Sequence, residues 1–250
     1  MTAVTVRQTE GISLRQAAFA AVVGYVLLQP VIYAEFVLDP QIVANNTAQT
    51  VQNIQTHGDV FARQIVCYLS NYVGDIIIAW ALYLLLAPVN RALSLLAAVF
   101  QWVYAVLGFQ GVLQLVDVFR VVRAGSYVKT FGTTQLQAQV DLLLRSHRYD
   151  WSFILILFGI HLVLVGYLIF RSGYFPKWLG IVIFVVGTGW VITPLRPFLF
   201  PSANFGWFFI LSFGELLLPL WLLIVGWRLK APVPSPLESP AADTVMGTTS

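Results

Sequence analysis

The stretch FGIHLVLVGYLIF (residues 158–170) places a single histidine, His161, inside an otherwise apolar run. The run belongs to a longer apolar segment, at about residues 151–171, that begins at Trp151 and ends at Arg171. A helix needs about 20 apolar residues to cross the hydrocarbon core of a bilayer. The segment therefore predicts a transmembrane helix with His161 near the middle of the membrane.

The composition of the whole chain agrees with this segment. Of the 250 residues, 58% are hydrophobic and only 10% are charged, and the mean hydropathy is +0.79. Soluble domains carry about 25% charged residues, so the composition excludes a globule surrounded by water and predicts the lipid bilayer as the main partner. The net charge of +3 includes no dense block of Lys and Arg, so nucleic acid is not expected as a partner.

Five further segments have the same length and character. The six predicted spans lie at about residues 16–38, 61–87, 92–119, 151–171, 178–199 and 207–227. The predicted fold is all-α, a polytopic membrane protein built as a six-transmembrane-helix bundle. This membrane domain covers residues 16–228, after a polar N-terminal segment at 1–15. The Pro-rich tail at 229–250 is predicted to be disordered, because it has too few apolar residues to form a core.

The connections between the spans alternate in length. Tight hairpins at 87–91 and 171–177 fall on one side of the membrane. Longer connections fall on the other side, at residues 39–60, 120–150 and 195–206. Within 120–150, four apolar residues recur at helical spacing: Leu136, Val140, Leu143 and Leu144. This periodicity predicts a short amphipathic helix in the 120–150 loop.

The distribution of basic residues leaves the orientation open. Seven Lys and Arg residues fall on each side of the predicted membrane, so the positive-inside rule favours neither orientation. Because the tight hairpins are short and charged, we expect both termini to be cytoplasmic in a multi-pass protein of the cell membrane.

Two further ionisable residues share the depth of His161. Asp75 lies in the middle of the second predicted span, and Glu215 lies in the middle of the sixth. A charged group at the centre of a span costs about 2.5–3.5 kcal/mol on insertion scales. Three such groups at one depth are expensive apart, so we expect Asp75, His161 and Glu215 to meet in a polar cavity.

Other polar residues occupy the half of the membrane nearer the long connections. They extend the predicted cavity and are Glu35, Asn71, Gln110, Gln114 and Ser212. Asn71 shares a helix face with Asp75, and Gln110 shares one with Gln114. Lone amides in membrane helices also serve as packing hydrogen bonds, which is the alternative for the two glutamines. His57 and His147 are expected in connections, facing water.

The predicted cavity is compatible with three functions. A carboxylate from Asp75 or Glu215 paired with His161 exchanges protons near neutral pH, which favours small-molecule or lipid binding or transport with proton coupling. The same three residues are also a ligand set for a divalent metal, the alternative being a membrane-embedded metal-dependent enzyme. A structural or sensory membrane protein is the third possibility. The sequence does not specify an oligomeric state.

Three segments carry a resemblance to a known family. They are WALYLLLAPVNRALSLLAAVF (80–100), FGIHLVLVGYLIFRSGYFPKWLG (158–180) and FGELLLPLWLLIVG (213–226). The chain resembles the bacterial integral-membrane family called domain of unknown function 4386 over most of residues 12–228. The resemblance implies a six-span membrane protein and no particular activity. An arginine is common in that family where this chain has Gln101, so an ion pair at this position is not carried over.

Overall fold

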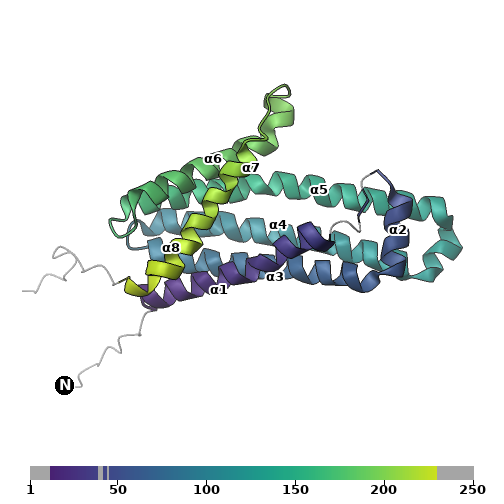
Figure 1. Ribbon diagram of the computed structural model, residues 1–250, viewed down its shortest axis with the longest axis horizontal. Helices are drawn as coiled ribbons and strands as arrows, with labels where there is room; N and C mark the ends of the chain where they lie inside the picture. The colour runs from purple at the N-terminus through teal and green to yellow at the C-terminus, as the bar shows by residue number, and fades with distance from the viewer. Residues whose placement is uncertain (1–11, 39–41, 44, 230–250) are drawn as a thin grey trace, which may run out of the picture.

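The computed structural model describes residues 12–38, 42–43 and 45–229, and this part of the chain is helical without a β-strand (Figure 1). Six helices are long and apolar enough to cross a membrane. They are Leu14–Phe36, Gly58–Leu86, Arg91–Arg123, Gly132–Arg171, Lys177–Leu199 and Phe208–Val225. The predicted all-α, six-span class is therefore confirmed. Most of the predicted N-terminal segment and tail lies outside the described residues.

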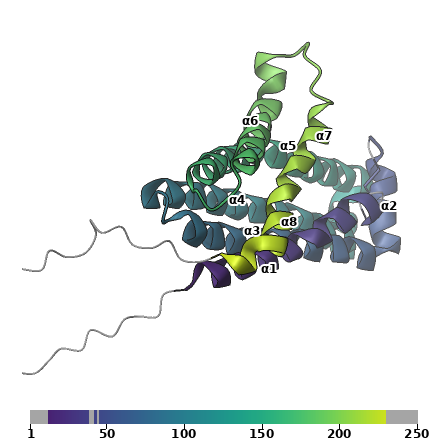
Figure 2. The same ribbon diagram turned by 60° about the vertical axis from the view of Figure 1, so that its left-hand side comes forward.

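The helices pack largely in chain order. The elements are α1 (Leu14–Tyr33), the π-helix η1 (Ala34–Leu38), α2 (Thr47–Thr56), α3 (Gly58–Leu86), α4 (Arg91–Arg123), α5 (Gly125–Arg171), α6 (Lys177–Leu199), α7 (Phe208–Ser212), the 3-10 helix η3 (Phe213–Leu216), α8 (Leu217–Val225) and the 3-10 helix η4 (Gly226–Arg228). Neighbours in the bundle are α1 with α3, α3 with α4, α4 with α5, and α5 with α6, while α8 returns to α1. The turn between α6 and α7 stands away from the bundle (Figure 2).

Local sequence explains where α1 begins and why it changes at its end. Ser13 caps the helix: its hydroxyl accepts from the Gln16 backbone N–H, while the Gln16 side chain accepts from the Ser13 backbone. Pro30 lies inside the helix and removes one backbone donor. The chain then widens into the π-helix that carries Glu35. Local π-helical geometry is often found at functional sites.

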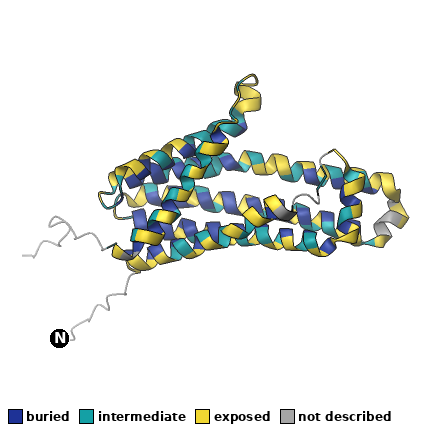
Figure 3. Cartoon of the chain, viewed as in Figure 1, coloured by how far each residue is buried: buried dark blue, intermediate teal, exposed yellow. Residues whose placement is uncertain are grey.

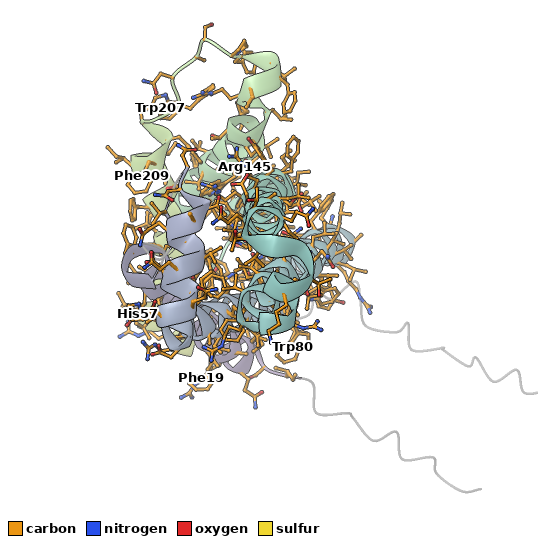
Figure 4. The ribbon with its side chains drawn as sticks, turned by 90° about the vertical axis from the view of Figure 1, so that its right-hand side faces the viewer. Phe19, His57, Trp80, Arg145, Trp207 and Phe209 are labelled. Carbon is orange, nitrogen blue, oxygen red and sulfur yellow. The ribbon has the colours of Figure 1, made fainter. Side chains whose placement is uncertain are left out.

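Large apolar side chains are exposed on the outer surface of the bundle. Buried residues face the interior and exposed residues face outward along the helices (Figure 3). In the view along the bundle, Phe19, Trp80 and Phe209 lie at its periphery (Figure 4), with exposed fractions of 71%, 38% and 62%. A surface of this kind is unfavourable in water and favourable in lipid. The chain is therefore a multi-pass membrane protein.

Glycines bring two helix pairs into close contact. A Cβ on Gly74 of α3 would lie 2.6 Å from the Gly24 carbonyl oxygen of α1. A Cβ on Gly180 of α6 would lie 2.6 Å from the Phe170 backbone nitrogen of α5. Small residues at membrane helix contacts allow the backbones to approach this closely.

The two tight hairpins meet at one end of the bundle. The Tyr174 hydroxyl, in the α5–α6 turn, donates to the Leu85 carbonyl at the end of α3. Burial raises the pKa of Tyr174 from its ordinary value of 10.0 to about 12, so this donor keeps its proton at neutral pH. The hydrogen bond agrees with the alternation of short and long connections predicted from the span count.

The predicted 120–150 loop is almost entirely helical. The helix α4 continues to Arg123, α5 begins at Gly125, and only Gly132, with φ 77° and ψ 168°, interrupts α5. Three residues of the predicted apolar face are buried: Leu136, Val140 and Leu144. The amphipathic face is thus present, but it belongs to a helix that runs directly into the fifth span. The helix α2, which the sequence analysis did not anticipate, packs against α3, α4 and α5 at this end.

Candidate functional site

Asp75 is buried in the bundle and held by two amides. Asp75 lies on α3 and is only 3% exposed. Asn71 Nδ2 donates to Oδ2 over 3.1 Å, and Gln101 Nε2 of α4 donates to Oδ1 over 2.8 Å. Both donors are neutral, and the Gln101 Oε1 atom is buried without a hydrogen-bond partner. The carboxyl group therefore has polar partners but no cationic one among these contacts.

His161 bonds to backbone rather than to a carboxylate. Its Nδ1 atom lies 2.9 Å from the Ala97 carbonyl oxygen of α4. Because a carbonyl only accepts hydrogen bonds, this contact requires a proton on Nδ1. His161 borders a crevice too narrow for a water-sized sphere, which is otherwise lined mainly by apolar residues such as Leu82 and Val165. The predicted pairing of His161 with Asp75 or Glu215 is therefore wrong: Nδ1 donates to the Ala97 carbonyl, while the two carboxylates accept from amides and from an indole.

Glu215 is held by a third helix. Trp190 Nε1 of α6 donates to Glu215 Oε2 over 3.2 Å. Glu215 lies in η3, where the sixth span changes from α-helical to 3-10 geometry four residues before Pro219. This break is expected, because Pro219 cannot donate to the Glu215 carbonyl. Glu215 also lies close enough to Asp75 for the two carboxylates to interact electrostatically.

An aromatic layer lies between the three predicted site residues. Tyr72 packs on Tyr104 with ring centroids 6.0 Å apart, and Tyr104 packs on Phe158 at 5.3 Å. Phe158 in turn contacts His161 at 6.4 Å and Trp190 at 6.2 Å. Asp75, His161 and Glu215 thus surround one layer of the bundle, but each has a different hydrogen-bond partner.

The predicted metal site is not assembled. In the part of the chain that the structure describes, no group of three His, Cys, Asp or Glu side chains is suited to hold a metal ion. Asp75, His161 and Glu215 are all within that part. Their side chains are directed to amides, to a backbone carbonyl and to an indole, so they do not converge on one point.

Three other predicted residues lie away from Asp75. Gln110 is exposed on the outside of α4. Gln114 Nε2 donates to the Asp150 carboxylate of α5 over 2.8 Å, and the Ser212 hydroxyl donates to the Phe209 carbonyl over 2.7 Å. The bond of Gln114 to Asp150 is a packing interaction of the kind that the sequence analysis gave as the alternative for the two glutamines. The three residues do not extend the site around Asp75.

A cavity of about 330 Å³ opens at the end of the bundle opposite the tight hairpins. It is lined by Glu35, Ile42, Gln64, Tyr68, Leu115, Leu144, His147, Arg148 and Trp151. Glu35 is the one predicted site residue that lines it. His147 was expected to face water from a connection, but it is partly buried on α5, and its Nδ1 lies 2.9 Å from the Gly111 carbonyl. The expectation fails because α5 is helical at this point and directs the ring into the bundle.

A continuous line of buried polar residues on α3 joins this cavity to Asp75. The line consists of Gln64, Tyr68, Asn71, Tyr72 and Asp75, with exposed fractions of 1%, 8%, 9%, 2% and 3%. Their spacing keeps them on one helix face. At 1.5 Å per residue the line extends about 16 Å along the helix. The first two members line the cavity and the last accepts the amides of Asn71 and Gln101.

Sequence reasoning did not include Gln101 or Tyr104 among the site residues, and named Gln101 only through the family resemblance, although a further signal was present. Both lie on the face of α4 that carries small residues such as Ala97, Ala105 and Gly108, and all five are buried. Small residues mark the packed face of a membrane helix. The sequence analysis instead followed the more polar stripe through Gln110, which faces outward.

Comparison with known proteins identifies a family. Residues 18–226 match the family described as Domain of unknown function (DUF4386). The chain belongs to this family. The resemblance in residues 80–100, 158–180 and 213–226 implied membership of DUF4386, and the family match confirms that prediction.

One similar protein supports the same conclusion. A protein of Archaeoglobus fulgidus, described as uncharacterized, is 36% identical over 162 residues, which cover 65% of this DUF4386 chain and 83% of the relative. No solved structure matches the chain. Neither the description of the family nor that of the relative names an activity.

Proposed function

We propose that this protein binds a small molecule or a lipid in the cavity bordered by Glu35 and His147, and that it couples binding or transport to proton uptake at Asp75. The observation that carries the proposal is the buried polar line from Gln64 to Asp75. Such a line is costly in a membrane interior, where intramembrane ionisable groups are usually functional.

The partners of Asp75 explain why a proton matters there. Its hydrogen bonds come from the neutral amides of Asn71 and Gln101, so proton uptake removes a buried negative charge that those amides do not balance. Electrostatic interactions are strong in the low dielectric of the bundle. A ligand that changes the cavity end of the line therefore alters the free energy of protonation at its other end, and the reverse follows by linkage.

Proton movement has suitable carriers along the line. The hydroxyls of Tyr68 and Tyr72 can both donate and accept hydrogen bonds, and the Asn71 amide offers both functions as well. The cavity supplies the entrance, and the tight-hairpin end is closed by contacts such as that of Tyr174 with Leu85. The arrangement supports alternating access better than a permanently open channel.

The test uses protein reconstituted in liposomes that contain a pH-sensitive dye. Short-chain phospholipids of different headgroups serve as probes, and proton entry on their addition is the expected result for the wild type. Asp75→Asn should abolish the signal; it keeps one of the two amide contacts, and its NH2 can donate to the other amide only if that amide turns its oxygen inward. Gln110→Leu, on the exposed face of α4, should keep the signal. Ligand-dependent proton entry that survives in Asp75→Asn would disprove the coupling.

The orientation belongs to the same proposal. We place both termini and the tight hairpins in the cytoplasm of a cell-membrane protein, so that the cavity opens outward. Cys67 is the native cysteine, so Cys67→Ser provides a background for single cysteines at Ser172 and at Gln49. In intact cells an impermeant maleimide should label the Gln49 position only. The opposite labelling pattern would reverse the orientation.

A further inference from the structure

The tight-hairpin end of the bundle collects exposed cations from several elements. They lie in the first or last turn of their elements and are Arg15 of α1, Arg91 of α4, Arg171 of α5, Lys177 of α6 and Arg228 of η4. Figure 1 shows these helix ends together, at the left of the view. Contacts of α5 with α6 and of α8 and η4 with α1 hold the ends in place. These five side chains form the basic surface.

The described residues place no carboxylate at this end of the bundle. Apart from Asp75 and Glu215 in the middle, their carboxylates lie at the cavity end and are Glu35, Asp59, Asp117, Asp141 and Asp150. Ion pairs such as that of Asp59 with Arg63, 3.2 Å apart, neutralise cations there. The sequence has equal numbers of Lys and Arg residues on the two sides of the membrane. The described carboxylates, rather than the cations, therefore make the two ends different.

The contacts within the basic surface leave its charges unbalanced. Arg91 Nε donates to the Tyr83 hydroxyl over 3.4 Å, and Lys177 Nζ lies 5.7 Å from the centre of the Phe170 ring. Both partners are neutral. Arg171, at the end of α5, is in no ion pair with another described residue. A surface with cations of one sign attracts an anionic partner.

The basic surface lies where the phosphate of a phospholipid would lie. Arg171 and Lys177 are at the ends of two apolar spans. Trp178 directly follows Lys177 and is 53% exposed, at the level that tryptophan prefers near the headgroups. Ile181, about one turn further into the span, is 52% exposed on the outside of the bundle. A phosphate held by these cations would leave its acyl chains beside exposed apolar side chains, which a soluble anion would not contact.

We propose that the basic surface binds the headgroup of an anionic phospholipid, with Arg171 and Lys177 as the main contacts of the phosphate. The surface lies at the opposite end of the bundle from the cavity, so the inference goes beyond the proposed function. A guanidinium forms paired hydrogen bonds with phosphate oxygens, and an ammonium adds a point charge. Because the described residues supply no carboxylate here, a zwitterionic headgroup finds no partner for its ammonium group. Basic clusters at the ends of spans recognise headgroups with a net negative charge in this way.

The experiment measures lipid binding to the delipidated full-length protein by native mass spectrometry. Phosphatidylglycerol is compared with phosphatidylcholine and phosphatidylethanolamine of the same acyl chains, and glycerol 3-phosphate is the soluble probe. One cation beside an anionic headgroup contributes a factor of about five. We expect phosphatidylglycerol to bind about tenfold more tightly than either zwitterionic lipid, and glycerol 3-phosphate not to displace it.

Variants locate the binding on the basic surface. Arg171→Gln and Lys177→Gln should each weaken phosphatidylglycerol about fivefold, and Arg171→Gln/Lys177→Gln should lose the preference for it. Arg171→Lys/Lys177→Arg keeps both charges and should retain the preference. The matched control Arg63→Gln/Arg120→Gln removes the same number of exposed cations at the cavity end and should also retain it. Because the replaced side chains are exposed, their replacement leaves the core intact.

Three results would overturn the inference. The first is equal binding of phosphatidylglycerol and phosphatidylcholine to the wild type. The second is an equal loss of preference in Arg63→Gln/Arg120→Gln and Arg171→Gln/Lys177→Gln, because the net charge of the whole protein would then explain the binding. The third is displacement by glycerol 3-phosphate, which would exclude a lipid as the source of the phosphate. None of them bears on the proton assay of Asp75, so the proposed function stands or fails separately.

Discussion

The hydrogen bond between Gln101 and Asp75 offers the sharpest test of the site. The donor and acceptor lie 2.8 Å apart on α4 and α3, and the two residues are 1% and 3% exposed. Replacing either partner alone leaves the other without this hydrogen bond, whereas replacing both with leucine removes the pair and leaves the Asn71 amide without its acceptor. We therefore expect each single variant to be destabilised, and Asp75→Leu/Gln101→Leu to be destabilised by less than the sum of the two single effects.

The magnitude follows from the geometry. Hydrogen bonds between membrane helices contribute about 0.6 kcal/mol on average and about 1.7 kcal/mol at most. A short bond to a buried carboxyl belongs near the upper end, so we expect a coupling energy of about 1.5 kcal/mol. For a protein of this size that corresponds to about 3–6 °C in the midpoint of thermal unfolding.

The measurement is a double-mutant cycle by reversible unfolding in mixed micelles. Gln110→Leu makes the same side-chain change at an exposed position of α4, so it should show no coupling to Asp75→Leu. If Gln101→Leu lowered the stability of the wild type and of Asp75→Leu equally, within about 0.5 kcal/mol, the Gln101–Asp75 hydrogen bond would not stabilise the site.

Three further predictions concern packing, pH and the histidine. Gly180→Ala should lower the free energy of unfolding by about 1–3 kcal/mol, because the added Cβ would lie 2.6 Å from the Phe170 backbone nitrogen. Gly125→Ala is the control, since a Cβ there has nothing within 4 Å. Equal effects of the two variants in denaturant titrations would exclude close packing as the cause. The pKa of Tyr174 is raised from 10.0 to about 12. The protonated hydroxyl therefore contributes its full stabilisation below pH 10, and this contribution is lost as the pH rises towards 12. Wild type should therefore lose stability relative to Tyr174→Phe in that window, and a constant difference from pH 8 to 12 would contradict this. In ¹⁵N NMR spectra, His161 should carry its proton on Nδ1, as the Ala97 carbonyl requires; a protonated Nε2 with a bare Nδ1 would refute the assignment.

The sequence by itself determined the architecture of this protein. Six apolar segments of membrane-crossing length can be located along the sequence, because a segment that crosses lipid as a helix needs about 20 consecutive apolar residues. Glu35, Asp75, His161 and Glu215 also stand out in the sequence, because an ionisable group in an apolar span is costly wherever it points. The tight hairpins at 87–91 and 171–177 were equally predictable, since their length leaves no other connection.

Only the tertiary structure decided which partners these groups have. The helical spacing of Gln110 and Gln114 says that they share a face, but not that this face turns outward and towards Asp150. The rotation of α4 is set by close contacts of small residues such as Gly108 with Tyr72, and it is this rotation that brings Gln101 to Asp75. His161 is satisfied by the Ala97 carbonyl, a backbone group that no side-chain pattern encodes. A sequence fixes which residues share one helix face, while the packing of neighbouring helices fixes what each face meets.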